Sequence, residues 1–345
     1  MFRKVIVALI LLGIVGGGYV AFDYYKKIYY PNVSLADKKT DFLYIPTGSS
    51  MEDVANLLYE KNYIKNRNSF LWVAEKKNYH NHVHPGKYLL RAQMSNDELI
   101  NLLRSGEQVP VDVTFNNVRL IEELPGKVAR KLELDSTDLL SMLKDETIAQ
   151  QYGFNVVTFK TMFIPNTYRF NWNTSAEEFI ERMAEEYKRF WNEERVAKAR
   201  AIGLSQSEVT ILASIVQAEQ QIRPDERPKI AGVYLNRIRK GMRLESDPTL
   251  VFALRDFSIK RVLNKDKEIE SPYNTYKYKG LPPGPINIPE PNSIDAVLNA
   301  DRHDYIFMCA KEDFSGYHNF AKNLRQHNIN AQKYHRALNE RKVMR

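Results

Sequence analysis

The stretch ILASIVQAE, residues 211–219, decides how the last part of the chain is interpreted. In a helix, residues at i, i+3, i+4 and i+7 share one face, and here that face carries Leu212, Ile215, Val216 and Glu219. A carboxylate therefore occupies the place of a fourth aliphatic residue. Because burying an unpaired ionised carboxylate is unfavourable, we expect Glu219 to hold its proton more tightly than a free glutamate and to suit a general acid. The structural alternative is that Glu219 reaches the surface or pairs with an arginine such as Arg237.

Length and composition describe an ordinary globular chain. Its 345 residues suffice for two or three domains, and 43% hydrophobic with 27% charged residues argues against wholesale disorder. The net charge of +8 suits nucleic acid, anionic lipid or an acidic polymer equally, but lysine and arginine are scattered and no nucleic-acid motif is present. Cys309 is the only cysteine, which excludes an intrachain disulfide and argues against a cysteine-based metal site.

The N-terminus predicts a membrane anchor. Between Lys4 and Asp23 the chain carries no charged residue, and an apolar stretch of this length just crosses a bilayer as a helix. A cleaved signal peptide is the alternative, but residues 18–22, GYVAF, lack a good small-x-small cleavage site. Basic residues before the span place the N-terminus in the cytoplasm and the rest of the chain outside, although two lysines that follow the span weaken this prediction.

Periodicity and turn residues predict an α+β fold in several parts. Two successive units each order strand, helix, helix and strand, and the local match between PGKYL at 85–89 and PNTYR at 165–169 supports a degenerate duplication. Such units resemble the LysM-type modules that bind glycan chains, although a purely structural module explains the pattern equally well. A long polar helix at about 177–201 leads to the last domain. The expected boundaries are an anchor at 1–22, a linker at 23–40, a LysM-like module at 41–110, a second α/β module with its connecting helix at 111–204, and the last domain at 205–345.

A histidine-rich segment interrupts the first module. On a strand, His80, His82 and His84 would present three imidazoles on one face, as a metal cluster requires. No acidic residue or cysteine lies close by to complete such a site, and the segment falls in a predicted loop. A solvated loop is therefore the favoured interpretation.

Polar and aromatic side chains gather at several points of the last domain. Residues 271–291 form a proline-rich irregular loop, and long rigid loops tend to be functional. Aromatic faces beside hydroxyl and amide donors are what a sugar ring needs. Each residue also has a structural interpretation: Asp247 as a helix cap, Tyr276 in the core, and His318 as a satisfied buried histidine. No catalytic Ser/His/Asp arrangement, phosphate-binding glycine loop or metal-ligand spacing competes.

Seven motifs follow one another in the last domain: ASIVQAE at 213–219, NR at 236–237, GMRL at 241–244, SDPT at 246–249, YNTY at 273–276, GLPPGPI at 280–286 and HNF at 318–320. Taken in this order, they resemble the YceG-like family of endolytic murein transglycosylases (MltG type). The likeness covers the whole chain, from the membrane anchor through the LysM-like region to a C-terminal mixed α+β catalytic domain at 205–345.

The resemblance implies an enzyme of the inner membrane, with its N-terminus in the cytoplasm and its catalytic domain in the periplasm. Such an enzyme cuts nascent peptidoglycan strands between N-acetylmuramic acid and N-acetylglucosamine, leaves 1,6-anhydro ends and so terminates strand elongation. Its partners would be glycan strands and the membrane, with wall-synthesis enzymes as further candidates. The resemblance implies no cofactor, no metal and no nucleic acid.

The family's catalytic glutamate maps onto Glu219. Family members often carry a second carboxylate two residues earlier, where this chain has Gln217, so Glu219 must be the essential acid. The segment around Pro165 often reads Glu-Gly before the proline and Asp after it. Here these positions hold Lys160-Thr161 and Asn166, which weakens a functional role for that loop.

A single well-placed carboxylate favours lytic chemistry, since glycosidases that hydrolyse usually need two. Asp247 is a doubtful candidate for the second carboxylate. A hydrolytic muramidase and a membrane-anchored peptidoglycan-binding scaffold without catalysis are the alternatives. We expect Glu219 to act alone as acid and base, and the residues expected to bind the glycan are Asn236, Arg237, Asp247, Tyr273, Asn274, Thr275, Tyr276, His318 and Phe320.

Overall fold

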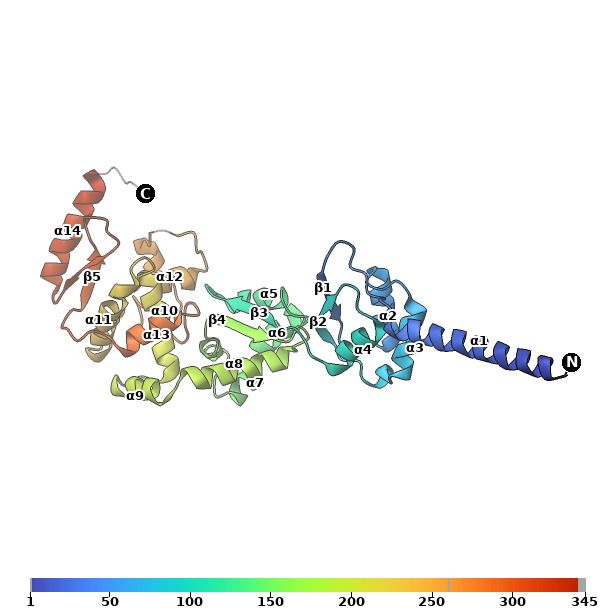
Figure 1. Ribbon diagram of the computed structural model, residues 1–345. Helices are drawn as coiled ribbons and strands as arrows, with labels where there is room; N and C mark the ends of the chain where they lie inside the picture. Colours follow the sequence, from blue (N-terminus) through green and yellow to red (C-terminus); the bar gives the residue numbers. More distant parts are fainter. Residues whose placement is uncertain (1, 260, 341–345) are drawn as a thin grey trace. The chain divides into compact units, whose positions relative to one another are not determined.

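The computed structural model describes residues 2–259 and 261–340. Its contacts divide the chain into two compact units of mixed α+β structure (Figure 1). The first unit comprises the chain up to Val113 with residues 131–134 and 168–175, and the second comprises residues 114–130, 135–167 and the chain from Ala176 onward. Residues of the expected second module, 111–204, therefore fall in both units.

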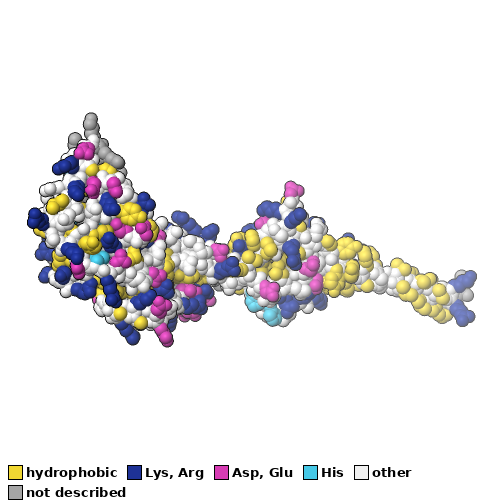
Figure 2. Space-filling view, turned by 60° about the vertical axis from the view of Figure 1, so that its left-hand side comes forward, with side chains coloured by type: hydrophobic (Ala, Val, Ile, Leu, Met, Phe, Trp, Pro, Cys, Tyr) yellow, Lys and Arg dark blue, Asp and Glu magenta, His cyan; other side chains and the backbone are white. Residues whose placement is uncertain are grey.

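The chain begins with one apolar helix, α1 (Phe2–Tyr29). By length and composition it could cross a membrane, a property that signal sequences share, and none of its residues is buried. Figure 2 shows hydrophobic side chains along this helix and basic side chains near its N-terminal end.

The segment expected to be a linker, 23–40, is instead part of the first unit. α1 continues to Tyr29, and the side chains of Val33 and Leu35 beyond it are buried in the unit's core. Val33 also forms an antiparallel bridge with Ile64. The prediction failed because two aliphatic residues in a polar stretch are too few to give a periodic signal, yet they suffice to anchor a short extended segment.

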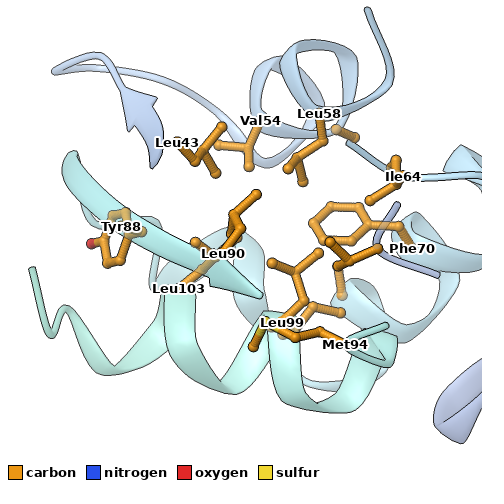
Figure 3. Close-up of a cluster of buried hydrophobic side chains, with 14 of the residues drawn as sticks. Leu43, Val54, Leu58, Ile64, Phe70, Tyr88, Leu90, Met94, Leu99 and Leu103 are labelled. Carbon is orange, nitrogen blue, oxygen red and sulfur yellow. The ribbon is translucent and has the colours of Figure 1, made fainter. Parts of the chain in front are cut away.

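In the first unit, a two-stranded antiparallel sheet packs against three helices. β1 and β2 pair antiparallel, with Leu43 opposite Tyr88, and Figure 3 shows the core between this sheet and the helices. This strand, helix, helix, strand order agrees with the prediction for 41–110, whereas its LysM-like character stays a prediction. The elements are β1 (Thr40–Ile45), α2 (Met51–Glu60), α3 (Arg67–Lys76), β2 (Gly86–Arg91) and α4 (Asn96–Ser105).

The histidine-rich segment folds as a 3₁₀ turn, η1 (Tyr79–Asn81), followed by a loop. Within residues 2–259 and 261–340, no group of three His, Cys, Asp or Glu side chains is arranged to hold a metal ion. The three-imidazole strand face therefore does not form.

The middle of the chain contains a second two-stranded sheet and several helices. The single polar helix expected at 177–201 is two helices, because the Asn192 side chain accepts a hydrogen bond from the backbone of Arg195 and caps a new helix there. The elements are β3 (Val111–Phe115), α5 (Glu123–Ala129), α6 (Ser136–Leu143), α7 (Glu146–Gln151), η2 (Phe159–Met162), β4 (Asn166–Phe170), α8 (Ala176–Phe190) and α9 (Glu193–Ala201).

The second unit is built around α10 (Gln206–Glu219), which packs against α11 (Arg227–Arg239) and α13 (Pro291–Leu298). The irregular loop predicted at 271–291 is confirmed up to Pro291, which opens α13, a helix that the sequence did not indicate. The remaining elements are η3 (Pro224–Glu226), α12 (Asp247–Leu254), η4 (Asn264–Glu268), the antiparallel pair β5 (Phe307–Ala310) and β6 (His318–Ala321), and α14 (Leu324–Glu340).

Candidate active site

α10 presents Glu219 to a cavity of about 440 Å³. The helix starts with a capping box in which the Ser205 hydroxyl accepts from the backbone of Glu208 and the Glu208 carboxylate accepts from the backbone of Ser205. Leu212, Ile215 and Val216 are buried in the core, as the helical stripe predicts. Glu219 ends the helix, and its half-buried side chain forms part of the cavity wall.

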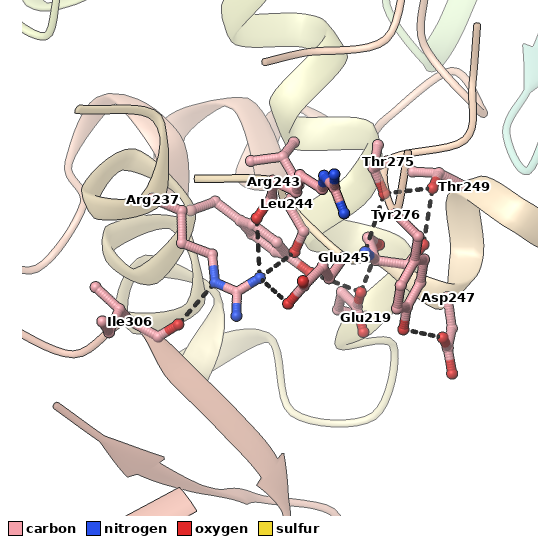
Figure 4. A network of polar contacts seen from close by, with 12 residues as sticks. Glu219, Arg237, Arg243, Leu244, Glu245, Asp247, Thr249, Thr275, Tyr276 and Ile306 are labelled. Carbon is pink, nitrogen blue, oxygen red and sulfur yellow. Dashed lines mark hydrogen bonds and ion pairs between the residues drawn. The ribbon is translucent and has the colours of Figure 1, made fainter. Parts of the chain in front are cut away.

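One oxygen of the Glu219 carboxyl group accepts both of the hydrogen bonds that the side chain makes with the cavity wall. The hydroxyls of Ser246 and Tyr234 donate to Oε1 over 2.6 and 2.7 Å (Figure 4). Oε2 has no hydrogen-bond partner among the residues that the structure describes. Burial raises the pKa of Glu219, and it outweighs the two hydrogen bonds, which favour the ionised form. The arrangement holds a carboxylic acid with one oxygen fixed and the other left to carry the proton.

Ser246 is the residue that connects α12 to the acid. It occupies the N-cap position of α12, but its side chain makes no capping bond and donates to Glu219 instead. Its backbone N–H donates to Thr275 Oγ1 over 3.0 Å, and that hydroxyl lies 2.8 Å from the hydroxyl of Thr249. Thr275, predicted to contact the glycan, is thus buried behind the acid and fixes the position of Ser246.

Asp247 and Tyr276 lie side by side on the cavity wall. The Tyr276 hydroxyl donates to Asp247 Oδ1 over 2.6 Å. Asp247 is the first residue of α12 and remains exposed, and no side-chain capping bond is formed there. Its negative charge contributes to the raised pKa of Glu219. Two of the predicted glycan-binding residues therefore share one side of the cavity.

His318 reaches the same cavity from β6. Its backbone N–H donates to Glu226 Oε1 over 2.9 Å, and its ring Nδ1 lies 2.7 Å from Glu226 Oε2. The Gln220 amide also donates to Glu226, over 2.6 Å. Burial opposes ionisation of Glu226, but these bonds hold its pKa below the usual value. Since a carboxylate accepts, Nδ1 is the protonated nitrogen, and Nε2 is left for a ligand.

Arg237 is buried, and its guanidinium donates hydrogen bonds to other groups of the protein. Nε donates to the carbonyl of Ile306 over 2.7 Å, and Nη1 donates to the carbonyl of Leu244 and to the carboxylate of Glu245 over 2.8 and 3.0 Å. Figure 4 shows these contacts of Arg237 with Ile306, Leu244 and Glu245. The alternative that Arg237 pairs with Glu219 is therefore wrong, because Glu245 takes that place.

Two predicted glycan-binding amides bond to backbone instead. Asn236 Nδ2 donates to the carbonyls of His303 and Tyr305 over 2.7 and 2.9 Å. Asn274 Nδ2 donates to the carbonyls of Lys267 and Ile269 over 2.9 and 2.8 Å. Both side chains are buried, and neither residue is part of the cavity wall. They position the loops around the site rather than contact a ligand in it.

Two predicted aromatic contacts also lie outside the cavity lining. The ring of Tyr273 packs 4.7 Å from that of Phe252, and the ring of Phe320 packs 5.7 Å from that of Tyr305. Of the residues predicted for the site, those that the structure brings together on the cavity wall are Glu219, Arg237, Asp247, Tyr276 and His318.

Three residues that contribute to the site were not predicted from the sequence. Tyr234 looked like a core residue of an apolar helix, and Ser246 looked like a helix cap. Glu226 lies between two prolines in a segment that reads as a turn. The available signal was position: Ser246 directly precedes Asp247, and Tyr234 lies one helical turn before Arg237.

Comparison with known proteins identifies relatives of this chain. The model of the YceG-like family matches residues 43–333. A Bacillus subtilis (strain 168) protein named endolytic murein transglycosylase is 31% identical over 95% of this chain and 93% of its own length. A Streptococcus pneumoniae (strain D39) protein of the same name is 25% identical over 85% of this chain, which spans 58% of that relative.

A solved structure shows a similar fold. The crystal structure of a putative YceG-like protein from Listeria monocytogenes aligns with a TM-score of 0.54 and 26% identity, covering 85% of this chain and 99% of that one. Because the family model matches most of the chain and the Bacillus relative aligns along nearly all of it, the chain belongs to the YceG-like family.

Proposed function

We propose that this protein is a membrane-anchored endolytic murein transglycosylase. It cleaves nascent glycan strands between N-acetylmuramic acid and N-acetylglucosamine, leaves 1,6-anhydro ends and so ends elongation. The names of the relatives support murein as the substrate. The observation that carries the chemistry is Glu219, an acid of raised pKa in a cavity wall with a single oxygen left open.

In the first step, Glu219 acts as general acid. Its proton passes to the glycosidic oxygen, the bond from that oxygen to C1 of the muramic residue breaks, and the glucosamine part leaves with a new hydroxyl. Positive charge develops on the muramic ring. A raised pKa favours the protonated acid, which is the state that this step consumes.

In the second step, the same side chain acts as general base. The Glu219 carboxylate takes the proton of the C6 hydroxyl of the muramic residue, and that oxygen bonds to C1 to close the anhydro ring. The acid is thereby regenerated and no water is consumed. The hydrogen bonds from Ser246 and Tyr234 stabilise the carboxylate between the two steps.

The roles of the side chains around Glu219 follow from their positions on or behind the cavity wall. The Asp247 carboxylate lies on the cavity wall, where it stabilises positive charge on the sugar ring. His318, oriented by Glu226, and Tyr276 offer ring edges and polar atoms to the glycan from the same wall. Arg237 acts through Glu245 and the backbone and positions this wall.

The test is to digest murein strands with the purified chain and weigh the products. We expect 1,6-anhydromuramic ends, and Glu219→Gln should lower kcat by about 10²–10⁴-fold, the usual contribution of a general acid. Glu194→Gln on α9 serves as the matched control, since the exposed Glu194 carboxylate forms its ion pair with Lys198 and, among the described residues, with no other cation. A Glu219→Gln protein that retained full activity would overturn the proposal.

The presence of Asp247 on the same cavity wall favours one alternative, a hydrolytic muramidase in which Asp247 activates water. That enzyme would release reducing muramic ends, heavier by one water, and Asp247→Asn would abolish their formation. The catalytically silent scaffold predicts no products from either reaction and glycan binding that Glu219→Gln leaves unchanged.

The membrane topology is part of the proposal. We propose that α1 anchors the chain in the inner membrane with its N-terminus in the cytoplasm and the catalytic unit in the periplasm, where wall-synthesis enzymes are candidate partners. The apolar character of α1 and the basic residues before its span support this orientation. Protease added to spheroplasts should then degrade the catalytic unit, whereas protection of this unit would contradict the topology.

A further inference from the structure

A second cavity in the same unit adjoins the site of Glu219. It measures about 370 Å³, and Asp247 contributes to the walls of both cavities. Ala218, the residue before Glu219 on α10, also lines it. Asp247 is the only carboxylate among its lining residues, and its main polar and aromatic contributors are Arg119, Arg261, Gln221, Asn287, Phe252 and Phe257.

The cavity is rich in cations without partners. The Arg119 guanidinium stacks 4.8 Å from the centre of the Phe257 ring, and neither Arg119 nor Arg261 pairs with a carboxylate in the part of the chain that the structure describes. Guanidinium groups in this state are suited to bidentate recognition of a carboxylate.

A third cation lies directly behind the wall. Lys160 is buried, and its Nζ donates to the carbonyl of Arg119 over 3.0 Å and lies 5.0 Å from the centre of the Phe252 ring. Burial lowers the pKa of Lys160 to about 8, so the ammonium still carries most of its charge at neutral pH. Lys160 is also subject to the charges of Glu122 and Glu123, so the positive character of the cavity itself comes from Arg119 and Arg261, set against Asp247.

The wall also contains an unmet hydrogen-bond acceptor. The Asn287 amide nitrogen donates to the carbonyl of Ser214 over 2.9 Å, whereas its buried Oδ1 accepts from no described group. Buried polar atoms without partners are rare in folded proteins, which makes this oxygen a place for a donor from outside the chain. A ligand that offers both N–H donors and carboxylates matches the cavity.

We propose that the second cavity binds the carboxylate-bearing stem peptide of the murein strand whose glycosidic bond lies at Glu219. The inference rests on the proposed function, from which it takes the substrate. While the lactyl carboxyl group of muramic acid is held in the amide bond to the stem peptide, the sugar part of the strand is uncharged, so the guanidinium groups would gain little from the sugar rings. The stem peptide supplies free carboxylates and amide N–H groups on a muramic residue of the same strand.

The experiment compares binding to two forms of one ligand. The full-length chain in detergent carries Glu219→Gln to prevent turnover, with and without Arg119→Gln and Arg261→Gln together. The ligands are soluble uncrosslinked murein strands that carry stem peptides, and the same strands after the free carboxylates of their stem peptides have been converted to neutral amides. Arg200→Gln, exposed on α9 and outside both cavities, is the matched control.

We expect the double arginine variant to bind the unmodified peptide-bearing strands about tenfold more weakly than its parent and to bind the amidated strands as well as its parent does, with the difference shrinking in high salt. Unchanged affinity for peptide-bearing strands, or an equal loss on both ligands, would overturn the inference. Failure of the proposed function would give a different result, because the wild-type chain would release no products from either ligand. The binding comparison would still decide whether the cavity binds the peptide.

Discussion

Glu219 is held between two opposing influences: burial favours its protonated form, and the hydrogen bonds from Ser246 and Tyr234 favour the carboxylate. Burial prevails and raises the pKa. A carboxyl group with a raised pKa in the folded state stabilises the fold at low pH, and this contribution is lost as the pH rises through the folded-state pKa. We therefore expect Glu219→Gln to increase the free energy of unfolding at pH 7. Urea denaturation at pH 7 tests this, and the gain should vanish below about pH 4. A variant that is less stable than the wild type at pH 7 would contradict the expected sign.

Ser246 offers a second prediction at the residue scale. Ser246→Ala removes a donor that favours the Glu219 carboxylate, so the pKa of Glu219 should rise further and the alkaline limb of the kcat profile should move to higher pH. The hydroxyl does not cap α12, so the helix loses no capping bond, but the higher pKa of Glu219 should lower the free energy of unfolding at pH 7. Ser246→Thr retains the donor and should restore the profile. An unshifted alkaline limb in Ser246→Ala would mean that the hydrogen bond does not tune the acid.

The sequence predicts individual residues of this site unevenly. Glu219 stands out because a carboxylate breaks an aliphatic stripe, and its raised pKa follows from that placement. The amides of Asn236 and Asn274 looked equally polar, yet they bond to backbone carbonyls. An amide has the same appearance in a motif whether its partner is a ligand or the chain itself. Only the fold separates the two cases.

At the scale of elements, close packing of α11 is open to a direct test. A Cβ atom on Gly232 would lie 2.6 Å from both the carbonyl oxygen of Asp301 and Nε2 of His303. In an open helix Gly→Ala stabilises by roughly 0.5–1 kcal/mol, but here it should destabilise by about 1–3 kcal/mol because backbone must move. Gly126→Ala in α5 is the control, since nothing lies within 4 Å of its Cβ. Thermal unfolding of both variants should show opposite signs; stabilisation by Gly232→Ala would refute the close contact.

Element boundaries show where periodicity stops being informative. The charged pattern of residues 177–201 continues smoothly, and the break between α8 and α9 depends on one capping bond from Asn192. α13 was missed because it opens with Pro291 at the end of a proline-rich loop, where breakers dominate the signal. The apolar stripe of α10 was predicted correctly because burial itself produces its pattern.

At the scale of the whole chain, the division between anchor and first unit gives the last prediction. The sequence suggests that a soluble protein can begin at residue 41, after a polar linker. In the structure, Val33 and Leu35 belong to the core, and Asn32 donates to the Asn96 side chain in a buried hydrogen bond of 2.7 Å. Burial of an aliphatic side chain contributes about 1.5–3 kcal/mol, so loss of both should cost the first unit about 3 kcal/mol or more.

Two truncated proteins distinguish a linker at residues 23–40 from a segment that belongs to the core of the first unit. Removal of residues 1–22 deletes only residues of α1 that are not buried, so we expect the first unit to keep its thermal transition. Removal of residues 1–40 should lower that transition or abolish folding of the unit, because the core loses two aliphatic side chains and Asn96 loses its partner. Circular dichroism melts of the two proteins under the same conditions measure the difference. Equal melting temperatures would show that residues 23–40 are the linker that their composition suggests, and that their packing against the first unit contributes nothing to its stability.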